Sequence, residues 1–184
     1  MSEFSEKVPC VECGKPVSAK LAQRREGRCL HCDLKRNPFF LLSKSLIERV
    51  HGPGGSFESL SESEKFYYSL DLFQGEVNNG GFHQFFFNSS GSYYELIEQG
   101  LSVLNELASL QLLRQAKEVV FPGVPVPVDM ETRRNAMPRP LGADKLDNLD
   151  RQFYANPDTL TPKLQAFARE HGLVPTEEQI KSEP

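Results

Sequence analysis

Four cysteines near the N-terminus form two Cys-x-x-Cys pairs, Cys10 with Cys13 and Cys29 with Cys32. Each pair can present two sulfurs to one ion. The fifteen residues between the pairs are enough to bring the second pair opposite the first, in the tetrahedron that zinc prefers. The alternatives are a redox dithiol pair or free thiols. The spacing favours metal, and we predict one Zn²⁺ per chain.

The predicted metal shell is complete with four sulfurs. It leaves no open position for a water molecule, so we expect the zinc to be structural and not catalytic. His31 lies inside the second pair and is expected to be a neighbour of the shell. A segment this short cannot bury enough apolar surface to fold alone, so metal binding would supply its folding free energy.

The N-terminal residues contain no apolar run that resembles a signal peptide. The sequence also has no stretch approaching the roughly 18 apolar residues that a membrane span needs. We therefore expect a cytoplasmic protein without a membrane partner. In a reducing compartment, paired cysteines indicate metal binding more than disulfides.

The rest of the sequence has the apolar spacing of helices. Helix starts are expected at Asn37-Pro38, at the capping boxes Ser61-x-x-Glu64 and Ser92-x-x-Glu95, and at caps Asp129, Asp144 and Thr159 or Thr161. Stops are expected at Gly52, at Asn78–Gly81, at Asn88, at Pro122 and at His171-Gly172. The predicted fold is mainly α, a compact multi-helix domain with a small N-terminal zinc ribbon. The predicted division is a four-cysteine zinc-ribbon module (1–37), an all-helical domain (38–172) and a disordered tail (173–184).

One stretch of the helical region, 76–88, concentrates polar groups beside a run of phenylalanines. Its candidate residues are Glu76, Asn79, Gly80, Gly81, Phe82, Gln84 and Asn88. A functional interpretation makes Glu76, His83 and Gln84 a site. In the structural interpretation, which we favour, the two glycines reverse the chain and the phenylalanines enter the core. The amides then hydrogen-bond buried backbone.

Familiar catalytic motifs are missing from the sequence, including the nucleophile elbow, the P-loop and the zincin helix. The four histidines are scattered, and every cysteine is assigned to metal. Asp147 and Asp150 lie three apart on a predicted helix, where such pairs are more often a solvated face or a cap. We therefore expect a protein that is not an enzyme.

Charge is distributed unevenly along the chain. Residues 1–37 carry a net charge of +3, and residues 38–184 carry −7. The basic residues near the cysteine loop are Lys15, Lys20, Arg24, Arg25 and Arg28. Between residues 50 and 113 there are eight carboxylates and one lysine. We expect these acids to point outward, because burial of unpaired acids is costly. The predicted acidic face for a partner comprises Glu58, Glu62, Glu64, Glu95 and Glu98.

The segment Glu76-Val-Asn-Asn-Gly-Gly-Phe-His-Gln-Phe-Phe-Phe-Asn-Ser-Ser-Gly91 resembles the bacterial DNA-mimic-protein (DMP) family domain. The segment Leu149-Asp-Arg-Gln-Phe-Tyr154 is similar to the last third of that family, and the resemblance covers roughly 40–172. It implies an all-helical fold, often as a homodimer. The implied activity is to present carboxylates in place of DNA phosphates to a DNA-binding regulator. The ribbon lies outside the resemblance.

Three functions follow as expectations. The first is a non-enzymatic binding and regulatory protein that engages a protein partner through its acidic helical surface, as a DNA mimic for a DNA-binding regulator. The second is a nucleic-acid-associated protein that contacts DNA or RNA through the basic ribbon while the body dimerises. The third is an enzyme of unrecognised type, which would need His83, Glu76 or Asp150 to converge in a pocket.

Overall fold

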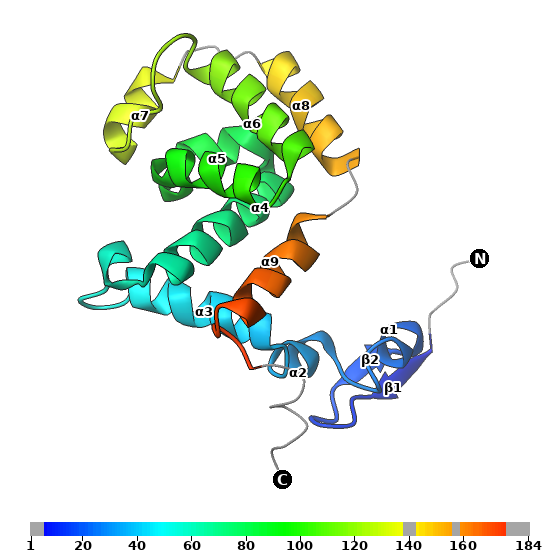
Figure 1. Ribbon diagram of the computed structural model, residues 1–184. Helices are drawn as coiled ribbons and strands as arrows, with labels where there is room; N and C mark the ends of the chain where they lie inside the picture. The colour runs from blue at the N-terminus through cyan, green and yellow to red at the C-terminus, as the bar shows by residue number, and fades with distance from the viewer. Residues whose placement is uncertain (1–5, 138–142, 156–158, 176–184) are drawn as a thin grey trace.

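The computed structural model describes residues 6–137, 143–155 and 159–175. Over these residues the fold is mainly helical with one small sheet, as predicted (Figure 1). The ribbon contains β1 (Lys7–Pro9), β2 (Pro16–Ser18), α1 (Ala19–Gln23) and α2 (Leu30–Leu34). The body contains α3 (Pro38–His51), the 3₁₀ helix η1 (Phe57–Ser59), α4 (Glu62–Phe87), the 3₁₀ helix η2 (Ser89–Tyr93), α5 (Tyr94–Val103), α6 (Leu107–Val120), α7 (Met130–Ala136), α8 (Ala143–Ala155) and α9 (Leu160–Glu170).

The ribbon is an antiparallel hairpin followed by two short helices. Val8 pairs with Val17 across β1 and β2. The turn between the strands uses Gly14 at a φ of +69°, a left-handed conformation that glycine adopts without strain. Val17 and Ala22 are its buried aliphatic residues. This small apolar base is consistent with a module that depends on a cross-link for its stability. In Figure 1 the ribbon lies at one end of the molecule, joined to the body where α2 leads into α3.

Two of the predicted N-caps are present at the first turns of α3 and α4. The Asn37 side chain accepts hydrogen bonds from the N–H groups of Phe39 and Phe40, at 3.0 and 3.2 Å, and so starts α3. Ser61 and Glu64 form a reciprocal capping box at the start of α4. Both predictions are confirmed.

Helix α4 is the central element of the body. It packs against α3, α5, α7, α8 and α9 (Figure 1). Its fully buried hydrophobic side chains are Leu70, Phe73, Val77, Phe82, Phe85 and Phe86. The predicted break at the glycine pair is present, but as a kink within α4 and not as the predicted reversal of the chain, because the non-helical angles are confined to Gly80 and Gly81. The phenylalanine run enters the core as predicted.

The second predicted capping box, at Ser92 and Glu95, is wrong. Helix α5 begins at Tyr94, and its N-cap Tyr93 makes no side-chain cap bond. The Ser92 hydroxyl instead donates to the carbonyl of Val128 at 2.6 Å. It also accepts from Arg133 at 3.1 Å, so a contact with a distant segment replaces the local cap.

The C-terminal helices begin and end with a mixture of local and distant contacts. Asp129 caps α7 by accepting from the N–H of Thr132 at 2.8 Å, as predicted. The predicted cap at Asp144 lies outside the described side chains. Helix α9 starts after Thr159, whose hydroxyl donates to Glu106 at 2.8 Å instead of capping its own helix.

The end of α9 confirms the expected stop at Gly172, which has a φ of +67°. The predicted tail, however, begins too early. Val174 is buried in the core and Leu173 packs against it, so the folded chain continues beyond Gly172. Residues 176–184 of that tail lie outside the described residues. Within the part of the chain that the structure describes, no helix combines the length and apolar content that a membrane span requires.

Candidate functional site

The four cysteines converge in the ribbon. Their sulfur atoms all lie within 4.8 Å of one another, and the Sγ atoms of Cys13 and Cys29 are 3.7 Å apart. A Zn–S distance of about 2.3 Å places tetrahedral sulfur ligands about 3.8 Å apart. The thiols therefore fit a tetrahedral metal ion. The Cys13–Cys29 separation is far longer than the roughly 2 Å of a disulfide.

The surroundings of the sulfurs differ from one cysteine to the next. The N–H of Cys29 donates to Cys10 Sγ at 3.2 Å, and this bond is the largest cause that lowers the pKa of Cys10 to about 6. Burial raises the pKa of Cys32. A bound cation would hold both thiols as thiolates. Cys13 is exposed, so one side of the site faces solvent, and His31 is exposed outside the group of four sulfurs.

The basic residues of the ribbon are partly neutralised by its own acids. Arg28 pairs with Glu26 at 2.7 Å and with Asp33 at 3.4 Å. Arg25 also pairs with Asp33, at 3.7 Å. The basic side chains that remain exposed beside the loop are Lys15, Lys20 and Arg24. The positive surface available to a phosphate backbone is therefore smaller than the sequence count predicts.

The kink of α4 is held by side chains of α8. At the kink, the N–H of Phe82 donates to Asp150 at 2.8 Å, and the carbonyl of Val77 accepts from the Tyr154 hydroxyl at 2.8 Å. Gly81 has a φ of +73°, and a Cβ at this position would clash with the Asp150 carboxylate. Asp150 therefore acts as a helix cap supplied from another helix. Its burial raises the pKa of this carboxyl, and Asp147 adds to the effect.

A second set of contacts bridges the kink through side chains alone. Glu76 accepts hydrogen bonds from the amides of Gln84 at 2.5 Å and Asn88 at 2.9 Å. The Asn79 amide donates to Gln84 at 3.3 Å. The amides therefore bond to a carboxylate and to one another, and not to buried backbone as predicted. At the kink itself, Asp150 and Tyr154 bond the backbone instead.

His83 does not join Glu76 and Gln84. Its exposed ring stacks on Phe87, with centroids 5.7 Å apart, and the guanidinium of Arg134 lies 4.2 Å from the centroid of the Phe87 ring. Asp150 bonds to backbone, as described above. Glu76, His83 and Asp150 thus each make a structural contact, and His83 is also close enough to Asp150 for its charge to oppose the rise in the pKa of that carboxyl.

A buried arginine that sequence reasoning missed holds the end of α4. Arg133 of α7 is 0% exposed. Its guanidinium donates to the carbonyls of Phe86 (2.8 Å) and Asn88 (2.5 Å). It also donates to the carbonyls of Pro127 (2.8 Å) and Val128 (2.9 Å) in the segment before α7.

The Arg133 contacts place a positive charge where the dipole of α4 is negative, which is favourable. Burial lowers the pKa of the guanidinium, but an arginine remains charged in proteins. Gly91 leaves room for this side chain, because a Cβ there would lie 2.7 Å from the Arg133 Nε. In the sequence, the charged pair Arg133-Arg134 has the pattern of an exposed helix face, so no local signal marks the buried member.

The predicted acidic face is only partly available to a partner. Glu58 and Glu62 have side chains 80% and 92% exposed, and Glu95 is exposed. Glu64, in contrast, is ion-paired with Arg49, which lowers the pKa of its carboxyl. Glu98 pairs with Arg114 at 2.7 Å. The most exposed carboxylates therefore lie on η1, at the N-terminal end of α4 and on α5.

The prediction that the acids of the region 50–113 point outward does not hold for all of them. Glu106 is buried and pairs with Lys163 of α9 at 2.6 Å. Asp71 is half-buried, and this burial raises the pKa of its carboxyl. Partners far along the chain offset the desolvation cost of burying the Glu106 carboxylate, and the local sequence does not reveal these partners.

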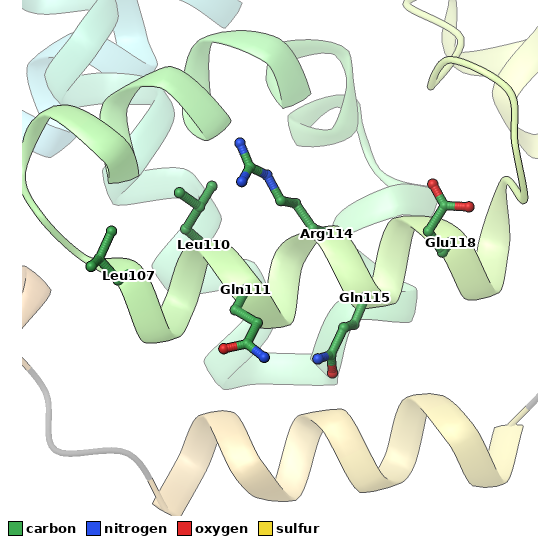
Figure 2. Close-up of a pocket in the computed structure, with 6 residues that line it drawn as sticks. All are labelled: Leu107, Leu110, Gln111, Arg114, Gln115 and Glu118. Carbon is green, nitrogen blue, oxygen red and sulfur yellow. The ribbon is translucent and has the colours of Figure 1, made fainter.

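An open hollow of about 440 Å³ runs along α6 (Figure 2). The residues that line it are Leu107, Leu110, Gln111, Arg114, Gln115 and Glu118. Figure 2 shows Gln111 and Gln115 projecting from α6 toward the side of α8, while Arg114 projects toward α5, where it meets Glu98. All of these lining residues come from one helix. The hollow therefore offers a surface and not an enclosed chemical site.

Comparison with known proteins identifies a family for this chain. Searches of curated proteins and of solved structures return no match. A family model described as "DMP19-like protein" matches residues 58–171, which is more than half of the chain. The match includes the kinked motif of α4 and its partners on α8, and it leaves out the ribbon and α3. The resemblance predicted from the sequence is thereby confirmed: the chain belongs to the family of DMP19-like proteins.

Proposed function

We propose that this is a non-enzymatic binding protein that uses acidic side chains of its helical body to engage a protein partner. In this proposal the carboxylates take the place of DNA phosphates toward a DNA-binding regulator. Membership of the DMP19-like family supports the proposal. The structural observation that carries it is the exposed carboxylate group made of Glu58, Glu62 and Glu95, which we call the acidic group.

Two members of the acidic group, Glu58 and Glu62, share a contact with one lysine. The Lys65 ammonium lies 3.1 Å from Glu58 and 3.2 Å from Glu62, so it holds the two carboxylates side by side. The aliphatic stem of Lys65 is mostly covered, and its ammonium lies 5.6 Å from the centroid of the Phe57 ring. Carboxylates fixed side by side attract a basic groove and repel nucleic acid, so they can compete with DNA for a DNA-binding protein.

The ribbon has a separate role in the proposal. We propose that the four cysteines hold one structural Zn²⁺, because their sulfur spacing fits a closed tetrahedral shell. The metal stabilises a module with little apolar core, and it takes no part in a reaction. A contact between the exposed Lys15, Lys20 and Arg24 and nucleic acid is the competing function, and it follows from the net charge of +3 in this part of the chain.

The test begins with purification of the binding partner from a native lysate and measurement of its affinity over a series of salt concentrations. The double variant Glu58→Lys/Glu62→Lys should weaken binding at least about tenfold and flatten its salt dependence. Lys65→Gln should strengthen binding, because it removes the positive charge between the two acids. Glu131→Lys on α7 makes half of the double variant's change of charge, at a single exposed residue elsewhere, and it should leave the affinity unchanged.

Two results would overturn the proposal. Equal affinities of wild type and Glu58→Lys/Glu62→Lys would remove the acidic group from the interface. Salt-dependent binding of the protein to DNA or RNA, abolished by Lys20→Glu/Arg24→Glu, would assign the function to the ribbon. Variants at Glu98 are less informative, because this residue stabilises α5 against α6 through Arg114.

A further inference from the structure

A second hollow, of about 220 Å³, lies where α3, α4 and α9 meet, and it differs in kind from the one on α6. Each of the three helices contributes one face to it. The residues that line it are Phe39, Phe40 and Ser43 of α3, Tyr67, Asp71 and Gln74 of α4, and Thr161, Leu164 and Gln165 of α9. We call it the three-helix pocket. Polar groups from three elements thus converge beside aromatic side chains, which is the usual composition of a small-ligand site.

The polar side of the pocket is centred on Asp71. The Ser43 hydroxyl lies 3.0 Å from the carbonyl of Phe39 and within hydrogen-bonding reach of Asp71 and the Tyr67 hydroxyl, and it can donate its one proton to only one of them at a time. Burial raises the pKa of Tyr67 to about 12, and the Asp71 carboxylate adds to this shift. Tyr67 and Ser43 therefore remain neutral, and Asp71 is the group that brings negative charge to the pocket.

The charge of Asp71 has no cationic counterpart in the pocket wall. No Lys, Arg or His is among the described residues that line it. Two cations lie on the helices around the pocket: Lys44 pairs with Glu48 at 3.7 Å, and the Arg169 guanidinium lies 4.8 Å from the centroid of the Phe39 ring, which lines the pocket. A half-buried carboxylate is normally compensated by a positive partner, because desolvation of the charge is costly.

The remaining walls restrict the shape of what can enter. Gln74 and Thr161 hydrogen-bond to each other at 2.9 Å and fix the polar wall between α4 and α9. Among the lining residues, Phe40 is 39% exposed and so borders the mouth of the pocket, whereas Leu164 is buried. The volume suits one small molecule or one long side chain, and it is below the range typical of drug-sized ligands.

We propose that the three-helix pocket binds an organic cation, with an ammonium or guanidinium group against Asp71 and its aliphatic part against Phe39 and Phe40. Two sources offer this chemistry, a free small amine or guanidine, and the Lys or Arg side chain of a bound protein. Three of the lining residues belong to α3, outside the family match at 58–171. The site is therefore a property of this chain and stands independently of the function proposed above.

The experiment titrates the full-length, zinc-loaded protein with n-butylammonium and n-butylguanidinium, and with n-butanol and butyrate as neutral and anionic matches. Binding is followed by NMR through the side-chain amides of Gln74 and Gln165. We expect saturable shifts with the two cations only, and at least a tenfold weaker affinity in Asp71→Asn. Asp147→Asn, an exposed carboxylate on α8, is the matched control and should bind as wild type does.

Further variants keep the test decisive if Asp71→Asn alters the fold. Phe40→Ala at the mouth should weaken binding severalfold while the melting temperature stays within a few degrees. A capped Gly-Arg-Gly peptide separates the two sources: tighter binding than the free guanidinium assigns the pocket to a partner's side chain, and exclusion of the peptide assigns it to a small molecule. Equal binding of butyrate and butylammonium, unchanged cation affinity in Asp71→Asn, or no shift with either cation overturns the proposal.

Discussion

Replacement of the buried Arg133 by methionine tests whether this side chain holds the end of α4. Methionine has a similar length and no hydrogen-bond donor. Arg133 is fully buried and donates to four carbonyls. Two of the four, those of Asn88 and Val128, keep another donor after the substitution. The loss therefore falls mainly on the carbonyls of Phe86 and Pro127.

The size of the effect follows from these two carbonyls. A buried acceptor left without its donor costs about 1–3 kcal/mol, so the pair gives about 2–6 kcal/mol. Methionine also avoids the desolvation of a guanidinium, which places the net loss in the lower half of that range, about 3 kcal/mol. In a protein of this size, such a loss lowers the melting temperature by roughly 6–12 °C.

Urea and thermal unfolding followed by circular dichroism measure the effect. Arg134→Met is the matched control: this neighbour makes one bond to the carbonyl of Phe87 from a more exposed position, so its loss should stay below about 1 kcal/mol. Arg133→Lys should fall between wild type and Arg133→Met, because lysine keeps the charge but not the planar fork. If Arg133→Met unfolds at the same urea concentration as Arg134→Met, the hydrogen bonds of Arg133 add nothing to the free energy of unfolding and the reasoning fails.

Three other changes probe the remaining features. Cys13→Ser should lose the one zinc per chain measured by elemental analysis while most helical signal remains, because the body has its own core; a metal-free native protein with two disulfides would contradict this. Gly81→Ala should lower the free energy of unfolding in urea by roughly 2–4 kcal/mol, because the φ of Gly81 is positive and the new Cβ meets Asp150. Gly80→Ala, whose Cβ meets the flexible Gln84 side chain, should lower it clearly less, and equal losses would refute the role assigned to Asp150. Asp71→Asn should gain stability relative to wild type as pH rises above 3.8, since the raised pKa of Asp71 means that its ionisation opposes folding; an unchanged difference in melting temperature from pH 3 to pH 7 would argue against this burial.

The features that the sequence predicted correctly are mostly local. Asn37 and Asp129 each reach a backbone N–H within three residues, and their caps form wherever the helix begins. The cysteine spacing likewise encodes the site within one short segment. The glycine pair marks the kink because few other residues tolerate the backbone angles found there.

The features that sequence reasoning missed depend on partners far along the chain. Ser92 has the pattern of a cap, but the carbonyl of Val128, 36 residues away, takes its hydroxyl. Glu106 has the sequence pattern of a surface acid, although Lys163, 57 residues later in sequence and on α9, pairs with it and allows it to be buried. Arg133 shows no sign of burial because its acceptors are main-chain carbonyls, which any sequence can supply. A prediction of this kind needs the packing of α4 against α7 and α9, which periodicity does not provide.

The kink of α4 has a consequence for synthesis of the chain on the ribosome. The six residues 82–87 form a helix too short to persist alone in water, and their first N–H group is capped by Asp150, 68 residues later. Translation at about 5–20 residues per second therefore leaves this phenylalanine-rich segment without its cap for roughly 3–14 s. During that interval the emerging polypeptide displays Phe82, Phe85 and Phe86, which the finished molecule buries completely, and this makes the segment a natural target for chaperones that hold nascent chains.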